Sequence, residues 1–354
     1  MLQRLEIRLA YTGKTAPLNQ DIFAGTCPKL RDVFLSRVPL LDRGYPAFQS
    51  VTRIEFGRRP VYRFSTISQV FPRAQRLNMI LDSLSGDAPP PQHVPARPPH
   101  LTRLRIWTTL NVLPPEVTAV LSASPPIADV ELDWWSGMRF DSAVPEYISI
   151  SEYLQNMNGP LDLSVFSIDG GGFTTDIVLL DLKSGVKRTF REPQLLESDN
   201  ESNRRALRGQ DIVTYNFTEE RFRPGLSMIV ALHIEPLFWN EIDDLTRRLP
   251  ALQLVELLVH GCPKNDSVID VDRWMNQDDH FPVPPIPRAE SCRVVELKIT
   301  AKPKTPGLKI RAFTILRLIR HCHFLGPDVR ARVTLENVSR IPCEYDGVLG
   351  SVAC

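Results

Sequence analysis

The stretch LTRLRI, residues 101–106, contains an apolar spacing that returns along much of the chain. Leu101 is followed by Leu104 three positions later and by Ile106 two positions after that. The closing alternation is typical of a β-strand, whose successive side chains point to opposite faces. The leading apolar residue anchors the turn into that strand. This spacing therefore predicts a short strand that begins just after a buried turn.

The same spacing recurs in order, with about 21 to 28 residues between the central apolar positions of the first six motifs. That interval is typical of leucine-rich repeats, in which each repeat contributes one strand to a shared sheet. The central positions are Leu5, Val33, Ile54, Leu77, Leu104, Val130, Leu232, Val255 and Val295, with a looser motif after Val329. We therefore expect these residues to share one layer of a parallel sheet.

Helical periodicity fills several of the gaps between these motifs, at residues 65–71, 114–124, 236–249 and 310–322. Ser65 suits an N-cap, prolines suit the first turn of the second stretch, and the third has acidic residues early and arginines late. One strand and one helix per repeat predict an α/β fold. We expect an irregular leucine-rich-repeat solenoid, a curved parallel sheet with outer helices and a β-rich insert.

Three stretches carry a resemblance to a known family: DIFAGTCPKLRDVFLSRV, FPRAQRLNMIL and LPALQLVELLVHG. Each places a proline shortly before a strand motif. In this they resemble the leucine-rich-repeat region of the F-box-type proteins that are abundant in mushroom-forming fungi. The resemblance implies a substrate-receptor role in a ubiquitin ligase. The F-box itself is not visible in the sequence. Because the first repeat strand begins at Leu2, we expect a further segment to precede that strand. A ligase adaptor is an expected partner only if that segment holds an F-box.

The expected organisation has three parts. Residues 1–144 and 227–354 hold the repeats, and residues 145–226 form a β-meander insert packed on the solenoid. The insert is inferred because the strand-and-helix rhythm stops there, while LDLSVFSI, FTTDIVLLDL, VKRTFRE and DIVTYNF all have strand-like patterns. Proline-rich segments at residues 86–100 and 276–290 are interpreted as stiff connectors.

The glycine-rich stretch SIDGGGFTTDIVLLD, residues 167–181, matches a phosphate-binding pattern locally. Its D-x-G-G-x-T-x-D spacing resembles a loop of actin and heat-shock ATPases, in which backbone N–H groups hold phosphates. Nothing upstream resembles the first phosphate loop of that fold, so we interpret the glycines as a tight turn between strands. The alternative function is an ATP-binding enzyme that uses Asp169 to Asp176. A rise in melting temperature with Mg-ATP, abolished by Gly171→Val, would favour it.

Composition argues for an intracellular protein with no catalytic motif. The net charge of +1 gives no bulk attraction to nucleic acid or to an anionic membrane. The chain shows no signal peptide and no apolar run that would span a membrane, and its six cysteines form no C-x-x-C pair. We expect a cytoplasmic or nuclear location. No nucleophile elbow, P-loop or dinucleotide fingerprint is present, so we expect neither enzyme activity nor a cofactor, and the histidines at 321 and 323 are interpreted as core or cap residues.

The concave face of the predicted sheet is the candidate partner-binding surface. Residues between the last two apolar positions of each motif point outward, and many of them are glutamates. Such carboxylates on adjacent strands repel one another unless a cation or a partner lies above them. They either keep the sheet soluble or form an acidic strip, with tryptophan anchors, for a Lys/Arg-bearing polypeptide. The candidates are Glu6, Glu55, Arg105, Trp107, Glu131, Asp133, Trp134, His233, Glu235, Glu256 and Glu296.

Overall fold

The chain forms two compact units, which are described separately. The first contains residues 1–157 and 185–193, and the second contains residues 158–184 and 194–354. The computed structural model describes residues 2–9, 17–41, 43–57, 63–81, 97–108, 113–134, 154, 156–167, 174–193, 223–235, 249–259, 268–269, 296–301, 308–311, 315 and 332–341. The division differs from the three expected parts, because the segment 145–226 contributes strands to both units.

Among its described residues, the first unit contains seven parallel strands. Their order in the sheet is β1-β2-β3-β4-β5-β6-β9. The bounds are β1 Arg4–Arg8, β2 Asp32–Ser36, β3 Arg53–Phe56, β4 Arg76–Leu81, β5 Arg103–Thr108, β6 Asp129–Trp134 and β9 Lys187–Pro193. Each of the first five strands pairs with the next one along the chain, and β6 pairs with β9.

The central apolar residues of the six sequence motifs lie in register. The ladder runs Leu5, Val33, Ile54, Leu77, Leu104 and Val130, each opposite the next. From Val33 onward these side chains are at most 2% exposed. The expected shared layer is therefore confirmed in this unit, because a period-two strand with one buried face allows only one register.

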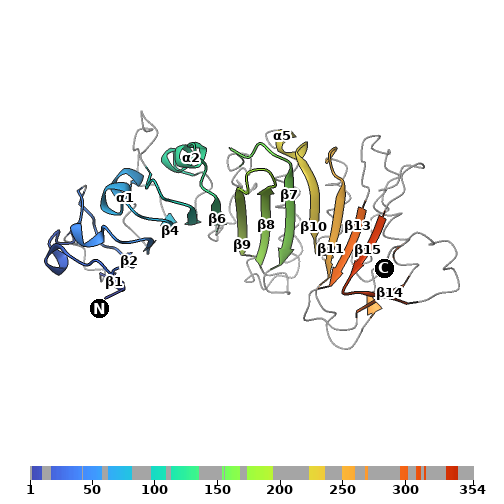
Figure 1. Ribbon diagram of the computed structural model, residues 1–354, viewed down its shortest axis with the longest axis horizontal. Helices are drawn as coiled ribbons and strands as arrows, with labels where there is room; N and C mark the ends of the chain where they lie inside the picture. Colours follow the sequence, from blue (N-terminus) through green and yellow to red (C-terminus); the bar gives the residue numbers. More distant parts are fainter. Residues whose placement is uncertain are drawn as a thin grey trace, which may run out of the picture. The chain divides into compact units, whose positions relative to one another are not determined.

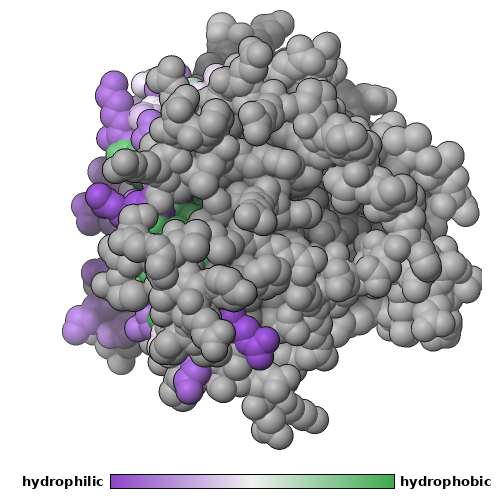
Figure 2. Space-filling model, turned by 90° about the vertical axis from the view of Figure 1, so that its right-hand side faces the viewer, coloured by the Kyte–Doolittle hydropathy of each residue, from purple (hydrophilic) through white to green (hydrophobic). Residues whose placement is uncertain are grey.

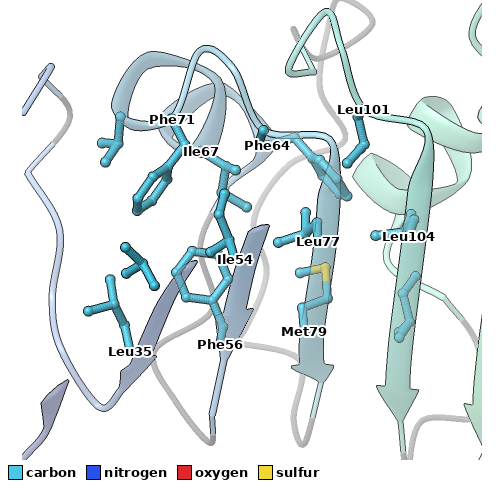
Figure 3. Packing of buried hydrophobic residues seen from close by; sticks show 14 of the residues in the cluster. Leu35, Ile54, Phe56, Phe64, Ile67, Phe71, Leu77, Met79, Leu101 and Leu104 are labelled. Atoms are coloured by element: carbon cyan, nitrogen blue, oxygen red, sulfur yellow. The ribbon is translucent and has the colours of Figure 1, made fainter. Parts of the chain in front are cut away.

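Helices and aromatic side chains cover the buried face of this sheet. Helix α1 (Phe64–Val70) and helix α2 (Pro115–Ser122) confirm two of the expected helices. Figure 3 shows Phe64, Ile67 and Phe71 directed toward the sheet, where Phe71 lies on the side of Phe56. Burying such a side chain stabilises the fold by about 1.5–3 kcal/mol relative to leaving it exposed. The core of this unit therefore lies between the sheet and these connections.

A helix does not follow every strand, which corrects the expected layer of outer helices. The connection before β2 contains the short 3-10 helix η1 (Ile22–Gly25), and the one before β3 contains η2 (Pro46–Phe48). In the second, Phe48 stacks between Tyr45 and Phe71, with ring centroids 5.4 and 5.1 Å apart. An aromatic stack thus fills the space that a longer helix would occupy. The class shown is α/β, with a large, mostly parallel sheet and few helices among the described residues.

Among its described residues, the second unit contains one sheet of six strands and one small sheet. The order is β8-β7-β10-β11-β13-β15, with β7 and β8 antiparallel and the other pairs parallel. Figure 1 shows β10, β11, β13 and β15 side by side. The bounds are β7 Leu161–Ser167, β8 Thr174–Asp181, β10 Ile229–Ile234, β11 Leu254–Val259, β13 Glu296–Ala301 and β15 Arg332–Glu336, with helix α5 Arg223–Leu226 before β10.

The small sheet of this unit has the order β12-β14-β16, and its strands are parallel. Its bounds are β12 Val268–Ile269, β14 Lys309–Arg311 and β16 Ser339–Ile341. The expected helices at 236–249 and 310–322, the two proline-rich segments and the histidines at 321 and 323 lie almost entirely outside the described residues.

Strands from the expected insert extend the sheets of the two units. In the first unit β9 pairs in parallel with β6, and in the second β7 pairs in parallel with β10. The glycine-rich stretch joins β7 to β8, whose antiparallel register brings Ser167 opposite Thr175. Its residues 168–173 lie outside the described part of the chain. These strands therefore belong to the sheets instead of forming a layer upon them.

A buried carboxylate holds the end of β8 against the start of β7. Asp181 is 1% exposed and accepts hydrogen bonds from the backbone N–H groups of Asn158, Gly159, Lys183 and Ser184, at 3.0, 3.1, 2.8 and 3.0 Å. Burial by itself raises the pKa of this carboxyl, but the four donors outweigh burial and lower the pKa to about 2. Asp181 therefore stays ionised and closes both turns.

Substitution of Gly159 by alanine is expected to destabilise the second unit. A Cβ at this position would overlap Oδ1 of Asp181 and lie 2.7 Å from Cβ of Lys183. Because the carboxylate is held by four hydrogen bonds, it cannot move away without losing some of them, and we expect a loss of roughly 1–3 kcal/mol. Urea unfolding followed by circular dichroism measures the loss. Gly44→Ala, where a Cβ meets nothing closer than 3.8 Å, is the control; equal stability of the two variants would contradict the prediction.

Candidate functional site

The outer face of the first unit, opposite its apolar core, carries three rows of polar and aromatic side chains. The strand register sets these rows, because residues directly opposite one another on neighbouring strands share a face. The first row is Arg4, Asp32, Arg53, Arg76, Arg103, Asp129 and Lys187. The second is Glu6, Phe34, Glu55, Asn78, Arg105, Glu131 and Thr189, and the third includes Ile80, Trp107, Asp133 and Arg191.

The carboxylates of β6 are neutralised by arginines of β5. Arg103 contacts Asp129 at 3.4 Å and also pairs with Glu131. Arg105 lies 3.5 Å from Glu131 and 2.7 Å from Asp133. Glu131 and Asp133 are each 7% exposed, so the carboxylates of these pairs are shielded from water, whereas the arginine side chains remain partly exposed.

Asp133 has a second cation on its other side, since Arg191 of β9 lies 3.5 Å from it. Burial raises the pKa of Asp133, and the hydrogen bond and charge of Arg105 offset only part of this effect. The expected repulsion among the carboxylates is therefore relieved by cations of the chain itself. Glu131 and Asp133 are occupied by these contacts.

Two aromatic side chains of the outer face lie beneath arginines. The guanidinium carbon of Arg105 is 4.6 Å from the ring centre of Trp107, and that of Arg8 is 4.9 Å from Phe34. Both distances suit cation–π contact. The expected anchor Trp107 is thus half-buried under a cation, whereas the side chain of Trp134 lies outside the described residues.

In the second unit a charged network runs across five neighbouring strands. His233 of β10 lies between two carboxylates, with Nδ1 2.5 Å from Oε2 of Glu256 and Nε2 3.0 Å from Oδ1 of Asp162. Glu256 also contacts Lys298 of β13 at 3.1 Å, and Lys298 reaches Glu336 of β15 at 2.6 Å. Cations and anions therefore alternate from β7 to β15.

The network shifts the pKa values of its members. Burial lowers the pKa of His233, but hydrogen bonds and charge from Asp162 and Glu256 outweigh burial and raise it to about 9. Burial raises the pKa of Glu256, whereas its bonds to His233, Thr300 and Lys298 lower it to about 2. His233 is therefore a cation and Glu256 an anion at neutral pH.

The register corrects one part of the expected outer face. Leu297, not Val295, lies opposite Val255 and Val333, so the strand motif is displaced by two residues here. In consequence Lys298 lies opposite Glu256, and Glu296 lies opposite Leu254. The register expected from the sequence was wrong because Val295 lies three residues after the apolar Cys292, the same spacing as in the other motifs. In the observed register Glu256 lies opposite Lys298 instead of Glu296, so an ion pair forms where two carboxylates were expected.

The remaining candidates are more scattered. Glu6 is exposed and contacts Arg8 at 2.7 Å and Arg4 at 3.8 Å. Glu296 accepts a hydrogen bond from Thr334 at 2.9 Å, and Glu235 is 1% exposed. Glu55 is half-buried and makes no ion pair within the described part of the chain.

Sequence reasoning missed the arginines of the first row. An arginine stands directly before the central apolar residue in four motifs, at positions 4, 53, 76 and 103. That signal was present, because the residue before an inward-facing position must also point outward. It shows that the outer face of the first unit carries many cations as well as carboxylates.

Among the described residues, large apolar side chains are seldom exposed. Leu2, Phe23 and Leu182 are at least 40% exposed, and they come from separate segments. On the side of the molecule seen in Figure 2, the described residues are mostly hydrophilic, with only small hydrophobic areas between them. The described surface therefore offers charge and hydrogen bonding more than an apolar patch.

Comparison with known protein families, with curated proteins and with solved structures finds no match for this chain. Within the described ranges, no helix is both long and apolar enough to cross a membrane. In the same residues, no three His, Cys, Asp or Glu side chains are grouped so that they could hold a metal ion.

Proposed function

We propose that this chain is a non-catalytic protein-recognition scaffold of the leucine-rich-repeat solenoid type, which binds another polypeptide on the outer face of its sheet. The observation that carries the proposal is the in-register ladder of parallel strands in the first unit. It places rows of outward side chains about 4.8 Å apart along the sheet. Repeat proteins bind partners on surfaces of this kind.

The proposal includes the role that the family resemblance implies, the substrate-receptor part of an F-box-type ubiquitin ligase in the cytoplasm or nucleus. Support for that role is the strand interval together with the parallel order β1 to β6. An adaptor partner requires an F-box upstream in the same reading frame. Sequencing the transcript in the 5′ direction tests this directly.

The charges of the outer face favour a partner that carries both signs. The carboxylates Glu131, Asp133 and Glu256 are paired with arginine, histidine or lysine of the chain itself. A purely basic partner would have to displace these cations, which costs the desolvation and contacts already made. Mixed charge gives specificity and orientation through complementary potentials.

Face-directed substitution should remove the partner without unfolding the protein. Glu55→Lys combined with Asn78→Lys adds two long cations to the middle of the face, where neither original side chain makes an ion pair among the described residues. Because the added lysines repel a cation that a mixed-charge partner places beside Glu55, we expect recovery of a true partner to fall about tenfold, a difference of about 1.4 kcal/mol. Affinity capture with quantitative mass spectrometry measures this recovery.

The matched control is Asp21→Lys with Thr26→Lys, which makes the same charge change at exposed positions flanking η1. A partner lost with the face variant and kept with the control is then purified and titrated. If every captured protein is recovered equally with both variants, the outer face is not the recognition surface.

A further inference from the structure

Two arginines of the first row face each other across neighbouring strands without a counter-ion among the described residues. Arg53 of β3 lies directly opposite Arg76 of β4 in the parallel register, and Arg103 of β5 follows as the next residue of the row. Like charges directly opposite one another in a sheet are destabilising. The arrangement therefore leaves an unfavourable interaction that a bound anion would relieve.

The neighbouring arginines of the same row differ from this pair. Arg103 is engaged by Asp129 and Glu131, and Arg4 lies 3.8 Å from Glu6. Arg53 and Arg76 are exposed, and within the described residues neither makes an ion pair. The chain thus neutralises the buried charges of this face and leaves two adjacent guanidinium groups open to solvent.

We propose that Arg53 and Arg76 form a docking site for a short acidic segment of the partner polypeptide. The inference rests on the proposed function and specifies the chemistry of the partner at one point of the face. Guanidinium groups recognise carboxylates through two parallel hydrogen bonds, which fixes orientation as well as charge. Two arginines in register thus accept two carboxylates presented side by side.

The spacing suits an extended peptide with acidic residues two positions apart. Side chains on one face of an extended chain repeat every two residues, about 6.6–6.8 Å. The strands that carry the arginines are about 4.8 Å apart at the backbone, and the length of an arginine side chain allows the two guanidinium groups to spread to the wider spacing of the peptide. An acidic residue, any residue and a second acidic residue therefore match the pair.

The surroundings favour a peptide over a nucleic acid. Glu55 and Asp32 lie on the same face, one two positions along the strand of Arg53 and the other beside Arg53 in the register. Both are half-buried and, in the described part of the chain, make no ion pair. These fixed negative charges would repel a continuous phosphate backbone, whereas a peptide can place a lysine or an amide beside Glu55.

The test uses defined probes and the whole chain. The acidic probe is a fluorescein-labelled peptide with two glutamates separated by one glycine in a Gly-Ser background, and the neutral probe has glutamines instead. A ten-nucleotide oligo-dT is the third probe. Fluorescence anisotropy at low salt should show the acidic peptide binding at least about tenfold more tightly than the neutral one.

Arg53→Gln combined with Arg76→Gln should abolish that preference. Lys29→Gln with Arg73→Gln removes the same charge from two exposed loop positions and should retain it. Equal binding of both peptides to the wild type, or an unchanged preference in the double arginine variant, overturns the inference, as does tighter binding of the oligonucleotide.

The failure of this inference is distinguishable from the failure of the proposed function. If the face variant, Glu55→Lys with Asn78→Lys, loses its partner while the double arginine variant keeps both partner and peptide, only the acidic-segment inference fails. If peptide binding depends on the arginines but no partner responds to the face variant, the proposed function fails.

Discussion

Replacement of Asp181 by alanine is expected to destabilise the second unit by on the order of 3–5 kcal/mol, the largest loss we expect from a single substitution. Four backbone N–H groups would lose their common acceptor, although only the donor of Gly159 belongs to a buried residue. Each buried donor left unsatisfied costs about 1–3 kcal/mol, and water can recover part of that loss. Chemical unfolding followed by circular dichroism measures the change.

The variant Asp181→Asn tests how much of the loss comes from the charge of the carboxylate, because asparagine has nearly the same shape as aspartate. It keeps one oxygen acceptor but presents an NH₂ group to donors, so its loss should lie between those of the wild type and alanine. Asp32→Ala is the matched control, because Asp32 is a half-buried strand carboxyl that makes no hydrogen bond or ion pair through its side chain within the described residues. If Asp181→Ala were no more destabilising than Asp32→Ala, the four-donor site would not contribute as described.

The carboxylate of Asp181 also makes stability depend on pH in acid. The pKa of Asp181 is lowered from 3.8 to about 2 in the folded protein. A lowered folded pKa means that the contribution is present above pH 3.8 and disappears as pH falls through about 2. The difference in unfolding free energy between the wild type and Asp181→Asn should therefore shrink over this range.

The parallel ladder was predictable because one short apolar pattern indicates both where each strand lies and which of its side chains are buried. Leu5 through Val130 alternate with polar residues, and a slip of one position would expose every one of them. The pattern failed at residues 292–297, where two apolar choices, Val295 and Leu297, fit equally well. Only the partner strand shows that Leu297 holds the register with Val255.

Ion pairing across strands lay beyond sequence reasoning for a related reason. Glu256 meets His233 and Lys298 only because three segments, separated in the sequence by other elements, share one register. Sequence patterns showed glutamates in a column and predicted repulsion. The structure shows that the neighbours of Glu131 and Glu256 on adjacent strands include cations that pair with them.

The strands of residues 161–193 show the same limit. Their alternation predicted β-structure correctly, and a meander was the simplest topology for closely spaced strands. The antiparallel pairing of β7 with β8 fits a meander, but the parallel pairings of β9 with β6 and of β7 with β10 were not expected. Alternation defines which side chains share a face of a strand, but it does not define the neighbouring strand.

Substitution of His233 by glutamine is expected to lower stability by on the order of 2–3 kcal/mol near pH 6, because each unit of pKa difference corresponds to about 1.36 kcal/mol. The imidazolium is the cation between Asp162 and Glu256, and Lys298 contacts the other carboxylate oxygen of Glu256. Glutamine keeps a donor but leaves the two carboxylates without the charge between them. His100→Gln, at an exposed position, is the control.

The effect of His233 depends on pH in a defined direction. Its pKa is raised from 6.5 to about 9 on folding, so its contribution is fully present below pH 6.5 and is lost as pH rises through about 9. Glu256, with its pKa lowered from 4.5 to about 2, contributes above pH 4.5 and loses that contribution toward pH 2. The network is therefore most stabilising between about pH 4.5 and 6.5. Unfolding free energies of the wild type and His233→Gln should converge between about pH 7 and 10, whereas His100→Gln should follow the wild type throughout; parallel curves for the wild type and His233→Gln would show that the histidine is not the buried cation of this network.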